Sequence, residues 1–200
     1  MDNALKQHIV KNISRHHPFN VEEHQDELAL LTEPRYLHKL LKALRDDTNC
    51  LFSILVSICG VDYPEKEERY LVVYNLLSLK ANARVRVKVP LKAKQEICSV
   101  TDLYNSAHWY EREAFDMYGI KFAGNDDLRR ILTDYGFTHH PLRKDFPLTG
   151  YEEVRYDLEK QEVVYEPVKL DQEFRDFDFL SPWSGDIALP GDEKAEVKEG

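Results

Sequence analysis

The sequence predicts an α+β fold: a small, mainly antiparallel sheet faced by helices, with a long extended C-terminal arm. Three apolar runs between residues 51 and 89 are separated by short polar links, which is typical of sequential strands. A helix-spaced row of leucines precedes them. Beyond Gly124 both periodicities are lost, and after His140 prolines become frequent in a segment that still carries many aromatic residues. We therefore expect an α+β core domain at 1–122, an extended partner-wrapping segment at 123–189 and a disordered tail at 190–200.

Composition narrows the class of protein. The 200 residues carry a net charge of −9, which argues against a nucleic-acid binder, because such proteins present a basic face. No apolar run approaches the roughly 20 residues that span a bilayer. The N-terminal sequence MDNALKQHIV has neither a signal-peptide core nor an arginine-rich transit pattern. We expect a globular protein that works in the compartment where it is made.

The first third of the chain predicts two helices and one strand. Leu5, Ile9 and Ile13 fall at helical spacing, so a short helix is expected within 3–15, and one strand within 19–31. A stronger helix begins at Pro34, since proline is favoured in a first helical turn, and ends near Asp47. Its buried face is the leucine row at positions 37, 40, 41 and 44.

The next segment predicts three strands. Residues 51–59 read as a buried strand broken by the sequence GVDYP, and 69–79 as a second strand. In 84–89 valines alternate with basic residues, which indicates a strand with one buried face. Short links favour an antiparallel meander packed on the 34–47 helix. A helical turn is expected at 97–104.

The three cysteines predict no covalent framework. Cys50, Cys59 and Cys98 are odd in number and widely spaced, and no CxxC pair exists. They cannot build an iron–sulfur or structural zinc site alone, so we expect small buried side chains in a reducing compartment, and no metal in this chain.

The stretch from Trp109 to Pro147 mixes opposite charges with large aromatic residues more densely than any other part of the sequence. Such mixtures are typical of desolvated interfaces with paired charges. Residues 109–118 suit a helix in which Arg112 and Asp116 form an i, i+4 pair, and Gly119 suits its C-terminal end.

Candidate catalytic groups in this stretch lack supporting context. His108 with Glu111 and Glu113 could bind a metal on one helical face, but the second set of ligands that di-iron bundles need is missing. The vicinal pair His139–His140 reads as loop histidines. No GxSxG, GxGxxG or GxxxxGK[ST] motif occurs. A free-standing enzyme using His108 with Glu113, or His140 with Asp145, as acid and base is kept as an alternative.

Basic clusters at Arg129–Arg130 and Arg143–Lys144 lie inside this acidic protein. We expect a mixture of ion pairs within the chain and across an interface, because buried charges need partners and arginine provides a bidentate fork. The predicted partner-interface residues are Glu111, Arg112, Glu113, Asp116, Arg129, Arg130, Asp134, Tyr135, His140, Arg143, Lys144, Asp145, Phe146 and Trp183. No catalytic or cofactor-binding residue is predicted.

Long motifs in this half of the chain resemble one family. They read WYEREAFDMYGIKF from residue 109, DLRRILTDYGF from 127 and HPLRKDFPLTGYEEVRYD from 140, with ICGVDYP at 58–64 and FRDFDFLSPW at 174–183. The chain is similar to the 30 kDa subunit of respiratory complex I, the proton-translocating NADH:quinone oxidoreductase, from about residue 35 to 194. It departs from the family at Asn125–Asp126, where His-Pro is usual. This difference affects the expectation for a local turn. His139 stands where glycine is common in the family. A histidine there could cost the freedom to adopt a left-handed backbone conformation, which glycine has.

The resemblance implies a non-catalytic structural subunit of the peripheral arm. It implies no cofactor in this chain, with FMN and iron–sulfur clusters in partner subunits, and packing against the quinone-site subunit. The C-terminal segment would lie along that partner, and membrane association would come through the complex. The location implied is the cytoplasmic side of a bacterial inner membrane or the matrix side of the mitochondrial one. The equivalent subunit of a membrane-bound hydrogenase-type complex is the alternative.

Overall fold

The structure is a computed structural model that describes residues 3–24, 27–170 and 172. The chain divides into two compact units, Met1–Tyr151 and Glu152–Gly200. The division falls later than the boundary expected after residue 122, because residues 123–151 are held by contacts with the first unit. The predicted tail at 190–200 lies outside the described residues.

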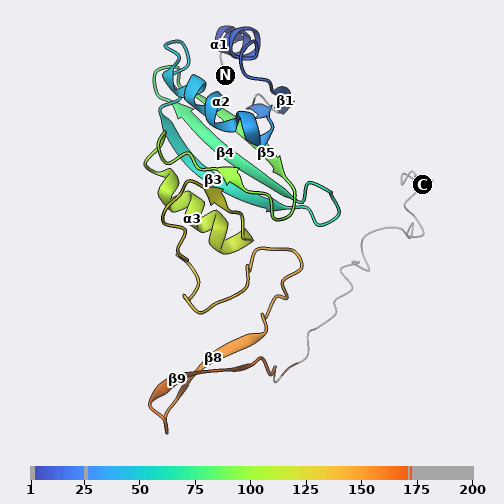
Figure 1. Cartoon of the computed structure of the whole chain (residues 1–200), viewed down its shortest axis with the longest axis vertical. Helices are drawn as coiled ribbons and strands as arrows, with labels where there is room; N and C mark the ends of the chain where they lie inside the picture. The colour runs from blue at the N-terminus through green and yellow to red at the C-terminus, as the bar shows by residue number, and fades with distance from the viewer. Residues whose placement is uncertain (1–2, 25–26, 171, 173–200) are drawn as a thin grey trace, which may run out of the picture. The chain divides into compact units, whose positions relative to one another are not determined.

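A five-stranded sheet forms the centre of the first unit (Figure 1). Its strands are β1 (Asn20–His24), β2 (Glu27–Leu31), β3 (Ile54–Asp62), β4 (Tyr70–Ser78) and β5 (Ala83–Leu91), in the order β1-β2-β5-β4-β3. β3, β4 and β5 form the predicted antiparallel meander, and β2 pairs with β5 in parallel. The mainly antiparallel sheet with few helices confirms the predicted fold class.

The N-terminal region differs in detail from the expectation. The predicted first helix is an α-helical piece, α1 (Asn3–His8), continued by a π-helical piece, η1 (Ile9–Ile13). The single strand predicted at 19–31 is wrong: two strands, β1 and β2, pair as an antiparallel hairpin. The two residues between them in the sequence, Gln25 and Asp26, include neither glycine nor proline, so the strongest turn signals are missing.

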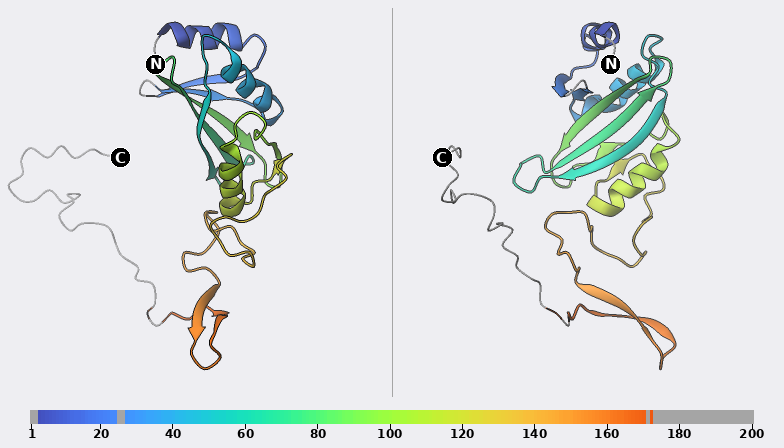
Figure 2. Two further views of the ribbon diagram at one scale, coloured as in Figure 1. Left: turned by 90° about the vertical axis from the view of Figure 1, so that its left-hand side faces the viewer. Right: turned by 180° about the vertical axis from the view of Figure 1, so that it is seen from behind.

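Both long helices cover the same face of the sheet. α2 (Pro34–Asp46) packs near β5, and α3 (Ala107–Tyr118) packs on β3. Figure 2 shows the other face from behind, with the helices on the far side of the sheet. The core contains the four α2 leucines, Phe52, Tyr74 and the inward valines of β4 and β5. Two short strands, β6 (Ile97–Cys98) and β7 (Phe122–Ala123), pair in parallel on either side of α3 in the sequence.

β3 departs from the sequence prediction. It begins at Ile54 rather than residue 51 and continues through Gly60 to Asp62. One of its faces is not buried, since Val56 and Cys59 are exposed. Gly60 has a packing role, because a Cβ there would lie 2.6 Å from Cδ2 of the Tyr118 ring. The missing side chain lets α3 approach the sheet.

The second unit contains a two-stranded hairpin that sequence analysis missed. β8 (Glu152–Asp157) and β9 (Glu162–Pro167) pair antiparallel around a tight turn, in which Gln161 has a positive φ of 54°. The segment was expected to be extended and aperiodic. Both strands are only six residues long and rich in glutamate, so their period-two signal is weak.

Candidate functional site: a charge-supported docking surface

Helix α3 organises the candidate site by directing carboxylates inward and a ring outward. Glu111 and Asp116 are completely buried, whereas Trp109 is 62% exposed. Gly119 ends the helix in the left-handed conformation with φ 76°, as the sequence predicted. A Cβ at Gly119 would clash with His140 and Arg143, so glycine is required both for its backbone conformation and for space.

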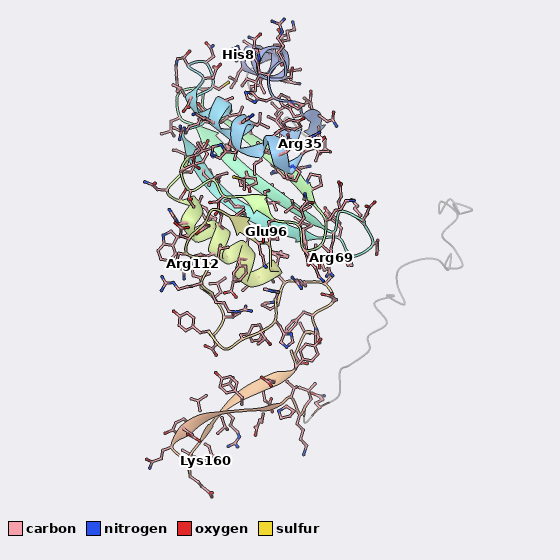
Figure 3. All side chains as sticks on the ribbon, in the orientation of Figure 1. His8, Arg35, Arg69, Glu96, Arg112 and Lys160 are labelled. Atoms are coloured by element: carbon pink, nitrogen blue, oxygen red, sulfur yellow. The ribbon has the colours of Figure 1, made fainter. Side chains whose placement is uncertain are left out.

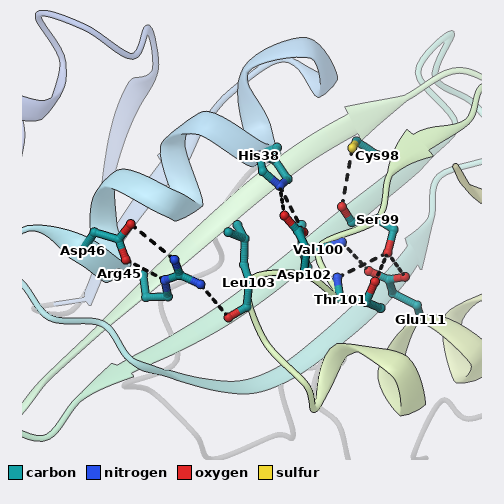
Figure 4. A network of polar contacts seen from close by, with 10 residues as sticks. All are labelled: His38, Arg45, Asp46, Cys98, Ser99, Val100, Thr101, Asp102, Leu103 and Glu111. Atoms are coloured by element: carbon teal, nitrogen blue, oxygen red, sulfur yellow. Dashed lines mark hydrogen bonds and ion pairs between the residues drawn. The ribbon is translucent and has the colours of Figure 1, made fainter. Parts of the chain in front are cut away.

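The buried Glu111 carboxylate connects α3 to the segments before and after it. Figure 4 shows its bonds to Ser99 and Val100, in the segment before the helix. It accepts hydrogen bonds from the Ser99 hydroxyl, the Val100 amide and the Asn125 side-chain amide, each at 2.8 Å. Burial raises the pKa of Glu111, against the lowering effect of these donors. Glu111 is therefore a structural carboxylate within this chain rather than a surface contact.

The Asp116 carboxylate holds the irregular segment that follows β7. It accepts hydrogen bonds from the amides of Ile131, Leu132 and Thr133 at 2.8–3.0 Å, and from the Thr133 hydroxyl at 2.5 Å. Burial acts to raise its pKa, but these donors outweigh burial and hold the pKa well below its usual range. One side chain thus fixes the backbone of residues 131–133.

Arg130 adds an ion pair to the hydrogen bonds at Asp116, and we call this group of contacts the Asp116 node. The guanidinium of Arg130 lies 2.7 Å from Asp116 and also donates to the carbonyl of His139 at 3.0 Å. The predicted pairing of Asp116 with Arg112 is wrong, because Arg112 instead donates to the carbonyls of Arg129 and Arg130. Arg130, the three amides and the Thr133 hydroxyl already occupy the oxygens of the Asp116 carboxylate. Arg112, on the same helix, therefore binds other acceptors.

Asp62, at the end of β3, anchors the later part of the same segment. Arg69 grips it with two hydrogen bonds of 2.7 and 2.8 Å, and the Lys144 amide donates to it at 2.8 Å. Arg69 also pairs with Asp145 at 3.0 Å. The arginine hydrogen bonds lower the pKa of Asp62 despite burial. Figure 3 labels Arg69 and Arg112, the two arginines that anchor opposite ends of the 129–145 segment.

His140 and Arg143 attach the middle of the segment to the end of α3. His140 is half-buried, with Nδ1 2.9 Å from the carbonyl oxygen of Asp116, and burial lowers its pKa. Arg143 donates to the carbonyl of Tyr118 at 2.7 Å. Since His140 and Asp145 bind different groups, the acid–base pair considered from sequence does not form in this structure.

An aromatic cluster holds the last part of the segment. The His139 ring lies 4.8 Å from the Tyr151 ring and 5.8 Å from the Phe146 ring, between centroids. Phe137 joins them edge-on. His139 is not among the positive-φ residues, so the glycine usual in the family is not needed here for backbone freedom.

Asn125 explains how the chain accommodates its other departure from the family. Its side-chain amide donates to the buried Glu111 carboxylate, and its side-chain oxygen accepts from the Asp127 amide at 3.0 Å. The asparagine therefore stabilises the turn after β7 with its own side chain, where the family usually has His-Pro.

Large apolar side chains project from this rigid support into solvent. Leu132 is 64% exposed and Tyr135 is 81% exposed, although the backbone at Leu132 is fixed by Asp116. Trp109 lies on the neighbouring helix with Arg112 over its ring at 5.3 Å. We call Trp109, Leu132 and Tyr135 the docking patch. Exposed rings on a backbone fixed by buried charges are typical of a preformed interface.

The predicted interface residues divide into two groups. Glu111, Asp116 and Arg130 lie inside the chain, and Arg143 binds within it, so these support the surface. The second group is exposed and consists of Glu113, Arg129, Tyr135, Lys144 and Asp145. Within it, Arg129 pairs with Asp127 at 2.6 Å. Asp134 is exposed and Phe146 is partly buried. Trp183 lies outside the described residues.

The residues considered for metal binding on α3 do not form a site. His108, Glu111 and Glu113 do not gather as three ligands; among the described residues the one such group is His8, Asp47 and Cys50. Only Cys50 is buried, so the expectation of three buried cysteines is wrong for Cys59 and Cys98. All three thiols are free.

The residues outside 109–147 that support the docking surface, above all Asp62 and Arg69, were not predicted from the sequence. Asp62 lies 82 residues from Lys144, so local patterns cannot connect the two. Its signal was present in the ICGVDYP motif, which places an acidic residue at the end of an apolar strand. Within the described ranges, no helix has the length and apolarity to cross a membrane.

Comparisons with known proteins agree with this architecture. Residues 30–152 match the family model of the respiratory-chain NADH dehydrogenase 30 kDa subunit. A NADH-quinone oxidoreductase subunit of Azorhizobium caulinodans, the one designated C, is 55% identical over 204 residues, covering 100% of this chain and 96% of the relative. The same subunit of Paramagnetospirillum magneticum is 60% identical over 169 residues, or 84% and 85% of the two chains.

A third relative, the equivalent NADH-quinone oxidoreductase subunit of Rhodospirillum rubrum, is 57% identical over 181 residues, or 88% of this chain and 85% of its own length. The matched family region contains the buried carboxylates Asp62, Glu111 and Asp116, and the docking patch. The family model and these relatives agree with the sequence motifs: the chain belongs to the 30 kDa subunit family of the respiratory-chain NADH dehydrogenase.

Proposed function

We propose that this chain is a non-catalytic structural subunit of the peripheral arm of proton-translocating NADH-quinone oxidoreductase, and that it packs on the quinone-site subunit of that complex. The relatives carry the name of a subunit of that enzyme. The site supports an assembly role, because its buried carboxylates bind backbone amides and arginines that shape a surface. The hydrogenase-type alternative gains nothing from these relatives.

The single observation that carries the proposal is the β8–β9 hairpin. Val154 faces Tyr165 across the strands, and Tyr156 faces Val163, so these four side chains share one face. All four are more than half exposed. A two-stranded hairpin by itself is only marginally stable in water, so an apolar face of this kind is suited to packing against another surface. This property of the hairpin supports a docking role.

The opposite face of the hairpin is charged. Arg155 lies 3.0 Å from Glu166 and 3.7 Å from Asp157, and Glu153 is paired across the strands with Glu166. This distribution makes the hairpin amphipathic, with one face suited to an apolar surface and one suited to water. We propose that the apolar face lies along the quinone-site subunit.

We place FMN and the iron–sulfur clusters in other subunits of the complex. The cysteine content supports that assignment for the clusters, because iron–sulfur clusters are typically held by four cysteine thiolates and this chain has only Cys50, Cys59 and Cys98. We also propose that the chain reaches the membrane through the complex. The side would be the cytoplasmic face of the inner membrane, as for bacterial subunits, or the matrix face in mitochondria.

The test is co-expression with the other peripheral-arm subunits, followed by capture in mild detergent. Tyr156→Ser combined with Tyr165→Ser removes the apolar face, and we expect the quinone-site subunit to be lost from the captured material. Val164→Ser is the matched control, because Val164 faces Arg155 on the charged side of the same hairpin. Full recovery of the quinone-site subunit with the double variant would contradict the proposal.

A further inference from the structure

Three potential metal ligands meet where the N-terminal helix touches the end of α2. They are Nε2 of His8, a carboxylate oxygen of Asp47 and Sγ of Cys50, and all lie within 4.8 Å of one another. His8 comes from α1, Asp47 follows α2, and Cys50 closes the turn after it. The group is distant in sequence from the docking patch and contributes nothing to it.

The spacing is close to that of a metal site. Nε2 of His8 lies 3.1 and 3.2 Å from the two oxygens of Asp47. Ligand atoms on a tetrahedral zinc ion are about 3.3–3.7 Å apart, given zinc bonds of about 2.0–2.3 Å. Small side-chain rotations would therefore open the group enough for an ion. Imidazole, carboxylate and thiolate are all zinc ligands.

Surrounding groups already orient the ligands. Asn12 Nδ2 lies 2.9 Å from Nδ1 of His8 and donates to it, which holds the ring with Nε2 directed at Asp47. For Nε2 to bind a cation, the ring proton moves to Nδ1 and the Asn12 amide turns its oxygen to accept from it, the outer contact usual for a metal-binding histidine. The Asp47 carboxylate accepts from the Asn49 and Cys50 amides at 2.8 and 3.2 Å. A cavity of about 380 Å³ reaches Asp47 and is lined also by Asn12, His16 and His17. Of the three proposed ligands, only Asp47 lines this cavity.

The three groups converge on one point. A bound cation would be held by a Cys50 thiolate, because metal coordination displaces the thiol proton. His8 and Cys50 both direct their polar atoms at one carboxylate, and a divalent ion between them would satisfy all three groups at once.

We propose that His8, Asp47 and Cys50 bind one divalent cation of the zinc type, with water as the fourth ligand, and that this ion fastens α1 to the end of α2. The role is structural and redox-inert. It revises the expectation that this chain holds no metal, which considered the cysteines together and the α3 residues but not this group. The proposed assembly function does not depend on it.

The test is titration of the metal-free, tag-free full chain with Co²⁺ as a spectroscopic substitute for Zn²⁺. We expect one equivalent to bind with a thiolate-to-cobalt charge-transfer band in the near ultraviolet, and Zn²⁺ to displace it. Cys50→Ser should abolish the band, and His8→Ala should weaken binding by about 100-fold or more, beyond the effect of a typical outer-shell change.

Cys98→Ser and His108→Ala are the controls, since each removes an exposed residue of the same type elsewhere in the chain. Both should bind Co²⁺ as the unmodified chain does. If Cys50→Ser does not fold, His8→Ala decides, because His8 is at the surface end of the group. Absence of the band, its persistence in Cys50→Ser, or unchanged affinity in His8→Ala would overturn the proposal.

Discussion

The Arg130 guanidinium lies 2.7 Å from the Asp116 carboxylate, and this contact joins α3 to the segment that carries the docking patch. Both partners are shielded from water, and the same carboxylate binds three successive amides. The positions of Leu132 and Tyr135 thus depend on a buried charge that belongs to the preceding helix.

Asp116→Ala should destabilise the first unit by about 3–5 kcal/mol, because it leaves a shielded arginine and several amides without their acceptor. The free energy of unfolding from urea denaturation measures this. Asp127→Ala is the control, since that exposed carboxylate binds the exposed Arg129, and it should have little effect. Equal effects of the two changes would show that the Asp116 node does not organise the segment.

Acid should weaken the fold through Asp62 as well as Asp116. The pKa of each is lower in the folded chain than the ordinary 3.8, so their contribution is present above that value and is lost as pH falls below it. Denaturation at about pH 7, 5, 4 and 3 should show the loss beginning near pH 4. Asp62→Asn should have a shallower acid dependence, and an unchanged slope would contradict the assignment.

Gly60→Ala should destabilise the chain by about 1–3 kcal/mol, the usual cost of overpacking a core contact. The new methyl group would meet the Tyr118 ring and push α3 away from β3. Gly136→Ala is the control, because nothing lies within 4 Å of a Cβ there. Thermal unfolding of both variants measures the difference, and a Gly60→Ala protein as stable as the control would refute the close packing.

Tyr74→Phe should leave the chain equally stable or make it more stable by up to about 2 kcal/mol. The Tyr74 hydroxyl is buried without a hydrogen-bond partner among the described residues, and an unsatisfied buried hydroxyl is costly. Urea denaturation measures the change. A clear loss of stability would instead reveal a buried water bound to this hydroxyl.

Local patterns predicted the sheet and the main helices because their signals are periodic. The α2 leucines and β5 valines each repeat at the spacing of their element, and every one of them is buried. The site was harder to predict, because its partners are far apart in sequence. Composition identified the stretch around Asp116. Choosing between Arg112 and Arg130 as the ion-pair partner of Asp116 required the fold.

The hairpins near the two ends of the described chain were not predicted, because their sequence signals are weak. The β1–β2 reversal has no glycine or proline, and the β8–β9 hairpin lacks a core to impose strict alternation. His8, Asp47 and Cys50 come from three different local environments, so no motif contains them. Sequence reveals which residues repeat, whereas the grouping of single polar residues is a property of the tertiary fold.

The most direct test of the central claim is binding of the quinone-site subunit by a chain in which the docking patch is made polar. Leu132→Ser combined with Tyr135→Ser changes two exposed side chains, so the free energy of unfolding should not change. Leu79→Ser, at an exposed turn beside β4, is the control. We predict at least a tenfold loss of the captured quinone-site subunit for the double variant alone; undiminished capture by that variant would contradict the account.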